Sequence, residues 1–143
     1  MRTTSVLAVL VFLATLPCSC QTEKPLKRVG MTCMLKDDPE AIRKYDEYHA
    51  NAWPEVVECA YSAGIRRVFI YRLGRQLFLF IEALPDFDPG GGGGDKMMEY
   101  HPRCREWDEL MRTFQTNVPG QPEGSTWVEM TGIHVTDHVG TGS

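Results

Sequence analysis

Two apolar runs joined by a two-residue turn constrain the fold of this chain more than any other feature. Residues 65–73 and 76–83 are rich in β-branched and aromatic side chains, which are enriched in strands. Gly74 and Arg75 separate them, and a connection of this length forms a tight hairpin turn. The pattern predicts a β-hairpin, and its apolar composition places it at the centre of the expected core.

A helical stretch with a break precedes the hairpin. Tyr45, His49 and Trp53 recur at every fourth position, which puts them along one face of a helix. Pro54 donates no N–H, and its ring collides with the carbonyl of Ala50 in a continuous helix. A helix break is therefore expected between Ala50 and Pro54.

Local signals mark where the two helical segments begin and end. Asp38 precedes a proline and a glutamate and is the predicted N-cap of the first segment. Gly64 is the predicted C-terminal stop of the second. Three- and four-residue spacing predicts that the apolar side of this second segment consists of Val57, Ala60 and Tyr61.

The remaining elements follow from periodicity. Residues 27–36 are predicted to form the first strand and 126–135 the last. Residues 95–100 and 102–116 are predicted helices, whereas the glycine-rich stretch 85–94 is predicted to be a flexible surface insertion. The longer helix has an apolar stripe made of Cys104, Trp107, Met111 and Phe114.

This order of elements predicts an α+β fold. Strand, helix, hairpin, helix and strand form the ferredoxin-like split β-α-β sandwich, in which helices cover one face of an antiparallel sheet. The other face of so apolar a sheet needs a cover. We expect a homodimer in which two sheets pair into a dimeric α+β barrel around a cavity.

The chain has the length of one domain, expected over residues 27–137, with a frayed tail at 138–143. A basic start and an apolar run within residues 1–20 predict a secretory signal peptide rather than a stable membrane span. Secretion is therefore expected, with a cytoplasmic location as the alternative. The net charge of −4 and the lack of a basic stripe argue against nucleic-acid binding.

Three cysteines would remain after cleavage of the signal peptide: Cys33, Cys59 and Cys104. Their spacing matches neither a dense disulfide scaffold nor a zinc site. Buried free thiols are the favoured interpretation, and one disulfide with an odd thiol is the alternative. We predict no metal site, because no histidine or cysteine stands at a suitable short offset from His49 or His101.

The order of several motifs resembles the L-rhamnose mutarotase family from about Arg28 to Asp137. The matching positions are Tyr45-x-x-x-His49-x-x-x-Trp53-Pro54-Glu55, Gly64, Ile70-Tyr71, Leu77-Phe78 and Cys104-x-x-Trp107-x-x-x-Met111. The resemblance implies a dimeric ferredoxin-like barrel that interconverts the α and β anomers of a deoxyhexose without a metal or cofactor.

The resemblance also implies roles for individual residues. It places Tyr45 and His49 in the sugar site, with the histidine as the acid–base group. Trp107 and Tyr71 are further substrate-binding candidates, Trp107 as an apolar platform for the deoxy-sugar methyl group. The chain departs from the family at two site aromatics, because Val68 and Asp108 stand in their place. The departures put the identity of the sugar in question more than the type of reaction.

Mutarotation opens and recloses the sugar ring, which requires one group that takes a proton and another that gives one. Histidine suits this task, since its pKa lies near neutrality. His49 is expected near a helix end, where the dipole favours the protonated ring, so the prediction is that His49 acts as the acid. Tyr45 would hydrogen-bond a sugar hydroxyl or the histidine. Without the resemblance, the same spacing is typical of an ordinary amphipathic helix face.

The leading hypothesis is thus a sugar mutarotase, an aldose 1-epimerase acting on L-rhamnose or a related deoxyhexose such as fucose. The alternative is a non-catalytic dimeric barrel that binds a sugar or another small ligand, as Val68 and Asp108 would allow. A third hypothesis is a haem-degrading or polyketide-tailoring barrel of similar shape, which predicts a bound cofactor that nothing in the sequence requires.

Overall fold

The computed structural model describes residues 25–89 and 93–134. Along the chain these residues form β1 (Lys27–Leu35), α1 (Pro39–Ala50), α2 (Pro54–Ser62), β2 (Ile65–Leu73), β3 (Gln76–Ala83), α3 (Gly93–Tyr100), α4 (Pro102–Phe114), β4 (Gln115–Thr116) and β5 (Val128–Glu129). The predictions for the signal peptide in 1–20, for the centre of the glycine tract and for the tail at 138–143 lie outside the described residues.

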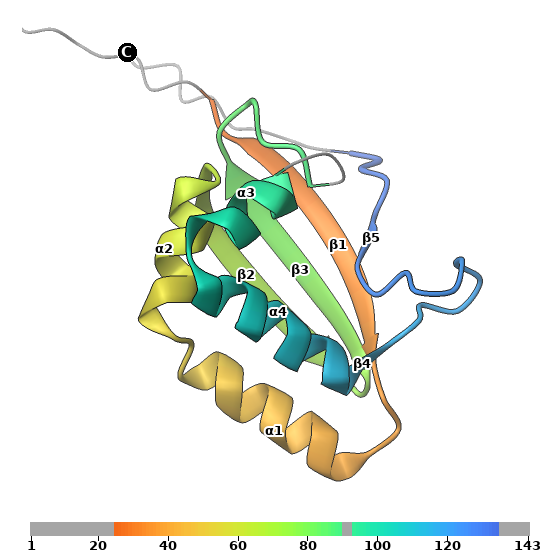
Figure 1. The fold of residues 1–143 in the computed structure, drawn as a ribbon. Helices are drawn as coiled ribbons and strands as arrows, with labels where there is room; N and C mark the ends of the chain where they lie inside the picture. The colour runs from red at the N-terminus through yellow and green to blue at the C-terminus, as the bar shows by residue number, and fades with distance from the viewer. Residues whose placement is uncertain (1–24, 90–92, 135–143) are drawn as a thin grey trace, which may run out of the picture.

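The sheet has the strand order β2-β3-β1-β4, and β5 pairs with β1 beside β4. Every pairing is antiparallel, and the helices lie together on one face of the sheet (Figure 1). A hairpin placed next to the first strand, with the last strands on that strand's other edge, is the ferredoxin-like arrangement. The predicted α+β fold class is confirmed.

Short-range signals set the element boundaries as predicted. The Asp38 side chain accepts a 2.9 Å hydrogen bond from the Glu40 backbone N–H at the start of α1. The helix stops at Ala50, and α2 begins at Pro54, so the predicted break is confirmed. Gly64 and Gly74 have φ values of 96° and 59°, which glycine adopts without steric cost.

The last strand is shorter than predicted. Only Val128 and Glu129 pair with β1, rather than the whole of 126–135. β4 already pairs with this edge of β1 at Met34 and Leu35, which explains the later start of the strand, because residue 126 would meet Met34 in the register of β5. The predicted helix 102–116 included the two residues that form β4.

The predicted apolar side of α2 is wrong for two of its three residues, since only Ala60 packs against the core. Val57 and Tyr61 are 61% and 65% exposed, whereas Cys59 is fully buried. A disulfide joins Cys59 to Cys104 of α4, with Cα atoms 6.6 Å apart, and this tether turns Cys59 inward. The favoured interpretation of three free thiols is therefore wrong for these two, and the alternative holds: one disulfide with Cys33 as the odd, buried thiol.

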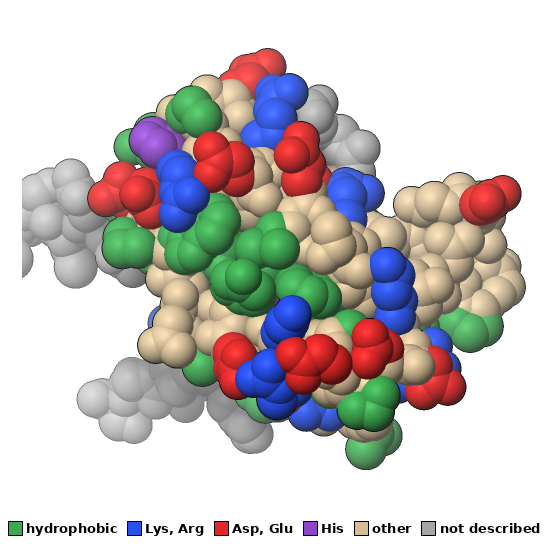
Figure 2. All heavy atoms as spheres, turned by 60° about the horizontal axis from the view of Figure 1, so that its bottom comes forward, with side chains coloured by type: hydrophobic (Ala, Val, Ile, Leu, Met, Phe, Trp, Pro, Cys, Tyr) green, Lys and Arg blue, Asp and Glu red, His purple; other side chains and the backbone are tan. Residues whose placement is uncertain are grey.

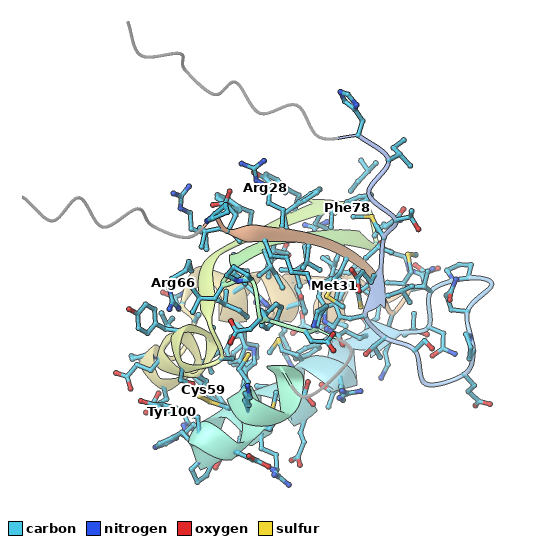
Figure 3. The ribbon with its side chains drawn as sticks, turned by 90° about the horizontal axis from the view of Figure 1, so that it is seen from above. Arg28, Met31, Cys59, Arg66, Phe78 and Tyr100 are labelled. Atoms are coloured by element: carbon cyan, nitrogen blue, oxygen red, sulfur yellow. A yellow bond between two sulfur atoms is a disulfide. The ribbon has the colours of Figure 1, made fainter. Side chains whose placement is uncertain are left out.

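The two faces of the sheet have different roles. The face toward the helices supplies the core through Val29, Cys33, Leu35, Leu77 and Ile81. Large apolar side chains on the opposite face remain exposed: Phe69, Tyr71, Leu73 and Phe80. Met31 and Phe78 lie on opposite sides of the sheet (Figure 3), as their register requires. The hairpin is therefore only half in the core, because its other face stays largely exposed among the described residues.

No helix among the described residues combines the length and the apolar character that a membrane crossing requires.

Candidate functional site

Six rings from α1, the α1–α2 break and α4 gather where these helices meet. We call this set the aromatic cluster: Tyr45, Tyr48, His49, Trp53, Trp107 and Phe114. The predicted site residues Tyr45, His49 and Trp107 all belong to it. The four-residue spacing in α1 aligns the first two, and the break at Pro54 brings Trp53 against Trp107, with ring centroids 5.2 Å apart.

His49 carries the imidazole of the aromatic cluster, the type of side chain whose usual pKa lies closest to neutrality. Its ring lies 4.1 Å from the Tyr45 ring and 5.3 Å from Trp107 between centroids. Nδ1 donates to the backbone carbonyl of Tyr45 at 3.0 Å, because a carbonyl oxygen can only accept. That bond fixes the tautomer in which Nε2 carries the lone pair of the neutral ring.

Burial lowers the pKa of His49 below its usual value near 6.5 and outweighs two opposing effects, the hydrogen bond to the Tyr45 carbonyl and the nearby charge of Asp46. The expectation that the helix end would keep the ring protonated is therefore wrong, because loss of hydration disfavours the cation more strongly. At neutral pH the ring begins as a base.

Tyr45 lies in the core at 2% exposure. Burial raises the pKa of its phenol, while a hydrogen bond between its side chain and Gln115 lowers that pKa by less. The hydroxyl is thus engaged with the start of β4. In this arrangement the Tyr45 ring stacks on one face of the His49 imidazole.

Trp107 is the centre of the aromatic cluster. Tyr48, His49 and Trp53 all meet its indole edge-to-face, with centroid distances from 5.2 to 6.2 Å. The Arg103 guanidinium covers the Trp53 ring at 3.7 Å, a cation–π contact across the α1–α2 break. At 8% exposure Trp107 leaves little of its surface for a ligand.

Tyr71 does not join the aromatic cluster. It lies on the uncovered sheet face, 59% exposed, with its ring 6.3 Å from that of Phe80. Its neighbour Ile70 points the other way and packs against the core, as strand alternation requires. Within one subunit Tyr71 and His49 therefore lie on opposite sides of the sheet, and the substrate-binding role of Tyr71 stays a prediction.

An ion pair that the sequence analysis missed links the edge strand to α1. Arg72 of β2 donates to both carboxylate oxygens of Asp46, at 3.0 and 2.5 Å. This bidentate geometry is the strong form of the interaction. Asp46 lies three residues before His49, so the pair holds the helix turn that presents the imidazole. The residues are 26 apart in sequence, and no local pattern connects them.

Residues of α4 line three hollows, and two of these bear on the predicted site residues. One of about 610 Å³ lies between α1 and α4 and includes Tyr48, Trp53 and Phe114 of the aromatic cluster among its lining residues. Figure 2 shows this side of the molecule, where hydrophobic side chains gather between charged ones. The other, of about 770 Å³, lies on the opposite flank of α4 and includes Asp108. His49 lines neither of these two hollows. Its ring is instead surrounded by the rings of Tyr45 and Trp107.

Within 25–89 and 93–134, no group of three or more histidine, cysteine or carboxylate side chains is arranged to hold a metal ion. His101 instead caps α4, where its Nδ1 accepts from the Arg103 backbone N–H at 3.1 Å. The helix therefore begins at Pro102, as predicted.

Known proteins match this chain over the residues that form the fold described above. A sequence model of the family described as L-rhamnose mutarotase matches residues 28–135. A UPF0734 protein of Dictyostelium discoideum is 42% identical over 99 residues, which cover 67% of this chain and 78% of that protein. The L-fucose mutarotase of Xanthomonas campestris is 32% identical over 106 residues, 73% of this chain and 83% of that enzyme.

A solved structure agrees with the fold. The L-rhamnose mutarotase from Formosa agariphila superposes with a TM-score of 0.56 at 15% identity, over 78% of this chain and 99% of that one. At this identity the superposition supports the architecture alone. The sequence match covers β1 through β5 and includes every member of the aromatic cluster. The chain belongs to the L-rhamnose mutarotase family.

Proposed function

We propose that this protein is a mutarotase that interconverts the α and β anomers of L-rhamnose or a related deoxyhexose such as L-fucose. The observation that carries the proposal is the state of His49. Its Nδ1 is bound to the Tyr45 carbonyl, and burial keeps the ring neutral, so Nε2 is the basic atom. Family membership supplies the reaction class, and the names of two relatives supply the candidate sugars.

The chemistry of ring opening assigns a sequence of roles to that atom. Nε2 of His49 takes the proton of the anomeric hydroxyl as the C1–O1 double bond forms and the bond from C1 to the ring oxygen breaks. The ring oxygen takes a proton from a second donor. After rotation about C1–C2, the steps reverse on the other face of C1, and the imidazolium returns its proton to O1. The predicted acid role of His49 thus belongs to ring closure.

Saturation-transfer NMR of equilibrated L-rhamnose and L-fucose tests the proposal. Micromolar protein should raise the anomeric exchange rate, and His49→Asn should lower the enzymatic part by about 10²–10⁴-fold, the usual contribution of a general base. His101→Asn is the matched control, because asparagine also caps helices, and it should keep full activity. No acceleration with either sugar, or full activity in a folded His49→Asn variant, would falsify the enzyme assignment for these sugars.

A non-catalytic sugar-binding barrel is the second candidate. It is favoured by Asp108, which stands at a family site aromatic and is bound to Arg112 at 2.7 Å, and by the aliphatic Val68. Calorimetric binding of a sugar without any change in anomeric exchange would select this candidate.

We propose in addition that the protein acts as a homodimer. The support is the uncovered face of the sheet, where Phe69, Tyr71, Leu73 and Phe80 are 41–75% exposed. A second copy seated face to face would bury them and complete an α+β barrel. Tyr71 would then lie at the interface between the two sheets.

Entry into the secretory pathway is proposed on two grounds: the apolar segment within residues 1–20, and the disulfide, since such bonds persist in oxidising compartments. N-terminal sequencing of protein recovered from the culture medium would test it, and an intact residue 1 in the cytosolic fraction alone would contradict it.

A further inference from the structure

One arginine joins β2, the hairpin turn and α1. Arg72 stands near the end of β2, and each of its three guanidinium nitrogens donates a hydrogen bond. Nε and Nη2 donate to the two carboxylate oxygens of Asp46 at 3.0 and 2.5 Å, and Nη1 donates to the Gly74 carbonyl at 2.9 Å. Because all three bonds come from one rigid plane, they fix the orientation of the guanidinium and the position of the carboxylate.

The residue that Arg72 binds is next to the group that orients His49. Nδ1 of His49 donates to the Tyr45 carbonyl at 3.0 Å, and this carbonyl belongs to the peptide bond between Tyr45 and Asp46. A peptide bond is planar, so a fixed Asp46 limits how far the Tyr45 carbonyl can turn. Through this peptide, the edge strand restricts the direction in which the imidazole points.

The ion pair also restrains the end of α1 that is packed least. The buried residues of α1 are Ala41 and Tyr45, and both precede Asp46. Helix ends fray, and the last turn of α1, which contains His49, ends at Ala50. The bond from Asp46 to the sheet therefore holds the helix just before the turn that presents the imidazole.

Arg72 further balances a charge beside the imidazole. The Asp46 carboxylate raises the pKa of His49, although burial lowers that pKa by more. The guanidinium bound to this carboxylate opposes its effect, and the other rings of the aromatic cluster carry no charge at neutral pH. Charged side chains elsewhere on α1 and on α4 form ion pairs of their own: Arg43 with Glu47, Arg103 with Glu106, and Asp108 with Arg112.

We propose that Arg72 is a positioning residue for His49, which orients the imidazole through Asp46 and the Tyr45 carbonyl and neutralises the carboxylate beside it. Its effect on the reaction rate rests on the proposed function, whereas its effect on the ring does not. A role in stability alone is the weaker explanation. The two side chains of the pair are 34% and 45% exposed, and ion pairs in contact with water contribute little to folding.

Substitutions at the two ends of the pair should move the pKa of His49 in opposite directions. Arg72→Gln leaves the carboxylate unpaired, which favours the imidazolium, so the pKa should rise. Asp46→Asn leaves the guanidinium unpaired, which disfavours the imidazolium, so the pKa should fall. A shift of about half a unit each way is expected from one unit charge across a partly hydrated gap. Arg72→Lys keeps the charge without the bidentate geometry, so the pKa should stay near the wild-type value.

Nitrogen-15 NMR of the histidine rings in the full chain measures the pKa and the tautomer, and His49→Asn identifies the His49 signals. The neutral wild-type ring should have its proton on Nδ1. In Arg72→Gln and Arg72→Lys, which cannot hold Asp46 in the same geometry, part of the neutral ring should instead be protonated on Nε2. Arg67→Gln is the matched control, because it breaks an ion pair between β2 and Glu82 of β3, and it should keep the wild-type pKa and tautomer.

Anomeric exchange of L-rhamnose and L-fucose measures the consequence for the reaction. Arg72→Gln and Asp46→Asn should each lower kcat/KM by about tenfold or more, because a small misplacement of a reacting group is costly. The acid midpoint of kcat/KM should move to higher pH in the first variant and to lower pH in the second, in step with the pKa of the free protein. Arg67→Gln should match the wild type in both respects.

The proposal is overturned if folded Arg72→Gln and Asp46→Asn keep the wild-type pKa and tautomer of His49. It is also overturned if both shift that pKa in the same direction, as a general loosening of the fold would, or if exchange is lost while the His49 signals stay unchanged. If the wild type accelerates exchange of neither sugar, the proposed function fails, and the NMR titration still decides the role of Arg72. Circular dichroism confirms that each variant is folded.

Discussion

At the scale of single residues, burial decides the chemistry of the candidate site. His49 lies in the last turn of α1, where the helix dipole favours a cation. The ring is nevertheless packed between Tyr45 and Trp107, and lost hydration is the larger effect on its pKa. At the same position on an exposed helix end, the dipole would instead raise the pKa of a histidine and favour its protonated form.

The lowered pKa of His49 predicts a pH profile for anomeric exchange. The neutral ring is the active base, so kcat/KM should be constant above the pKa and fall as the pH drops through it. Because the folded pKa is lowered, the midpoint should lie below about 6.5, the usual histidine value. Exchange rates from pH 4.5 to 8 would check this, and a midpoint at or above pH 7 would contradict the burial argument.

Cys33 should be inert in the folded protein. It is fully buried, and burial raises the pKa of its thiol to about 12, so almost no thiolate exists at neutral pH. Alkylation followed by peptide mass mapping should find Cys33 unmodified in the native protein and modified after unfolding. Rapid alkylation of the native protein would show that the β1 face opens in solution.

At the scale of elements, the break between α1 and α2 organises the helical layer. Pro54 interrupts the backbone hydrogen bonds of the helix, and Trp53 packs against Trp107 of α4. Arg103, also on α4, covers the Trp53 ring. The Cys59–Cys104 disulfide then fixes α2 to α4. The Cys59–Cys104 disulfide and the Arg103–Trp53 cation–π contact thus stabilise the aromatic cluster at the α1–α2 break.

This disulfide should contribute measurably to stability. Its cysteines are 45 residues apart, and the chain-entropy relation gives roughly 4 kcal/mol for a closed loop of that length. A reductant should lower the urea midpoint of the wild type but leave that of a Cys59→Ala/Cys104→Ala variant unchanged. Equal midpoints for the oxidised and reduced wild type would mean that the bond adds nothing to the folded state.

At the scale of the whole molecule, the uncovered sheet face is the dominant surface feature. Phe80 lies on the central hairpin strand and is 45% exposed, so Phe80→Glu would place a charge in the proposed interface. Light scattering should find the wild type dimeric and Phe80→Glu monomeric, because burying an unpaired carboxylate is costly.

The matched control is Val57→Glu. Val57 is an exposed apolar residue on α2, away from the sheet, and its substitution should leave the dimer intact. A wild type that is monomeric at every concentration would contradict the dimer proposal, as would a dimer that both variants retain.

The sequence by itself determined the features that depend on neighbouring residues. The Asp38 cap, the stop before Gly64, the turn at Gly74 and the alignment of Tyr45 with His49 follow from backbone geometry and helical spacing, so local patterns sufficed. The order of the elements then limited the fold to the ferredoxin-like arrangement, since few topologies bury such a hairpin under two helices.

Only the tertiary structure decided the rest. The disulfide between Cys59 and Cys104 and the ion pair between Asp46 and Arg72 form only in the folded chain. So do the position of Tyr71 on the sheet face opposite His49 and the short last strand of two residues. Each outcome depends on contacts between segments far apart in the chain. The tertiary structure also reversed the expected state of His49, because a pKa depends on how completely the surrounding side chains exclude water, and that exclusion exists only once α1 and α4 are packed together.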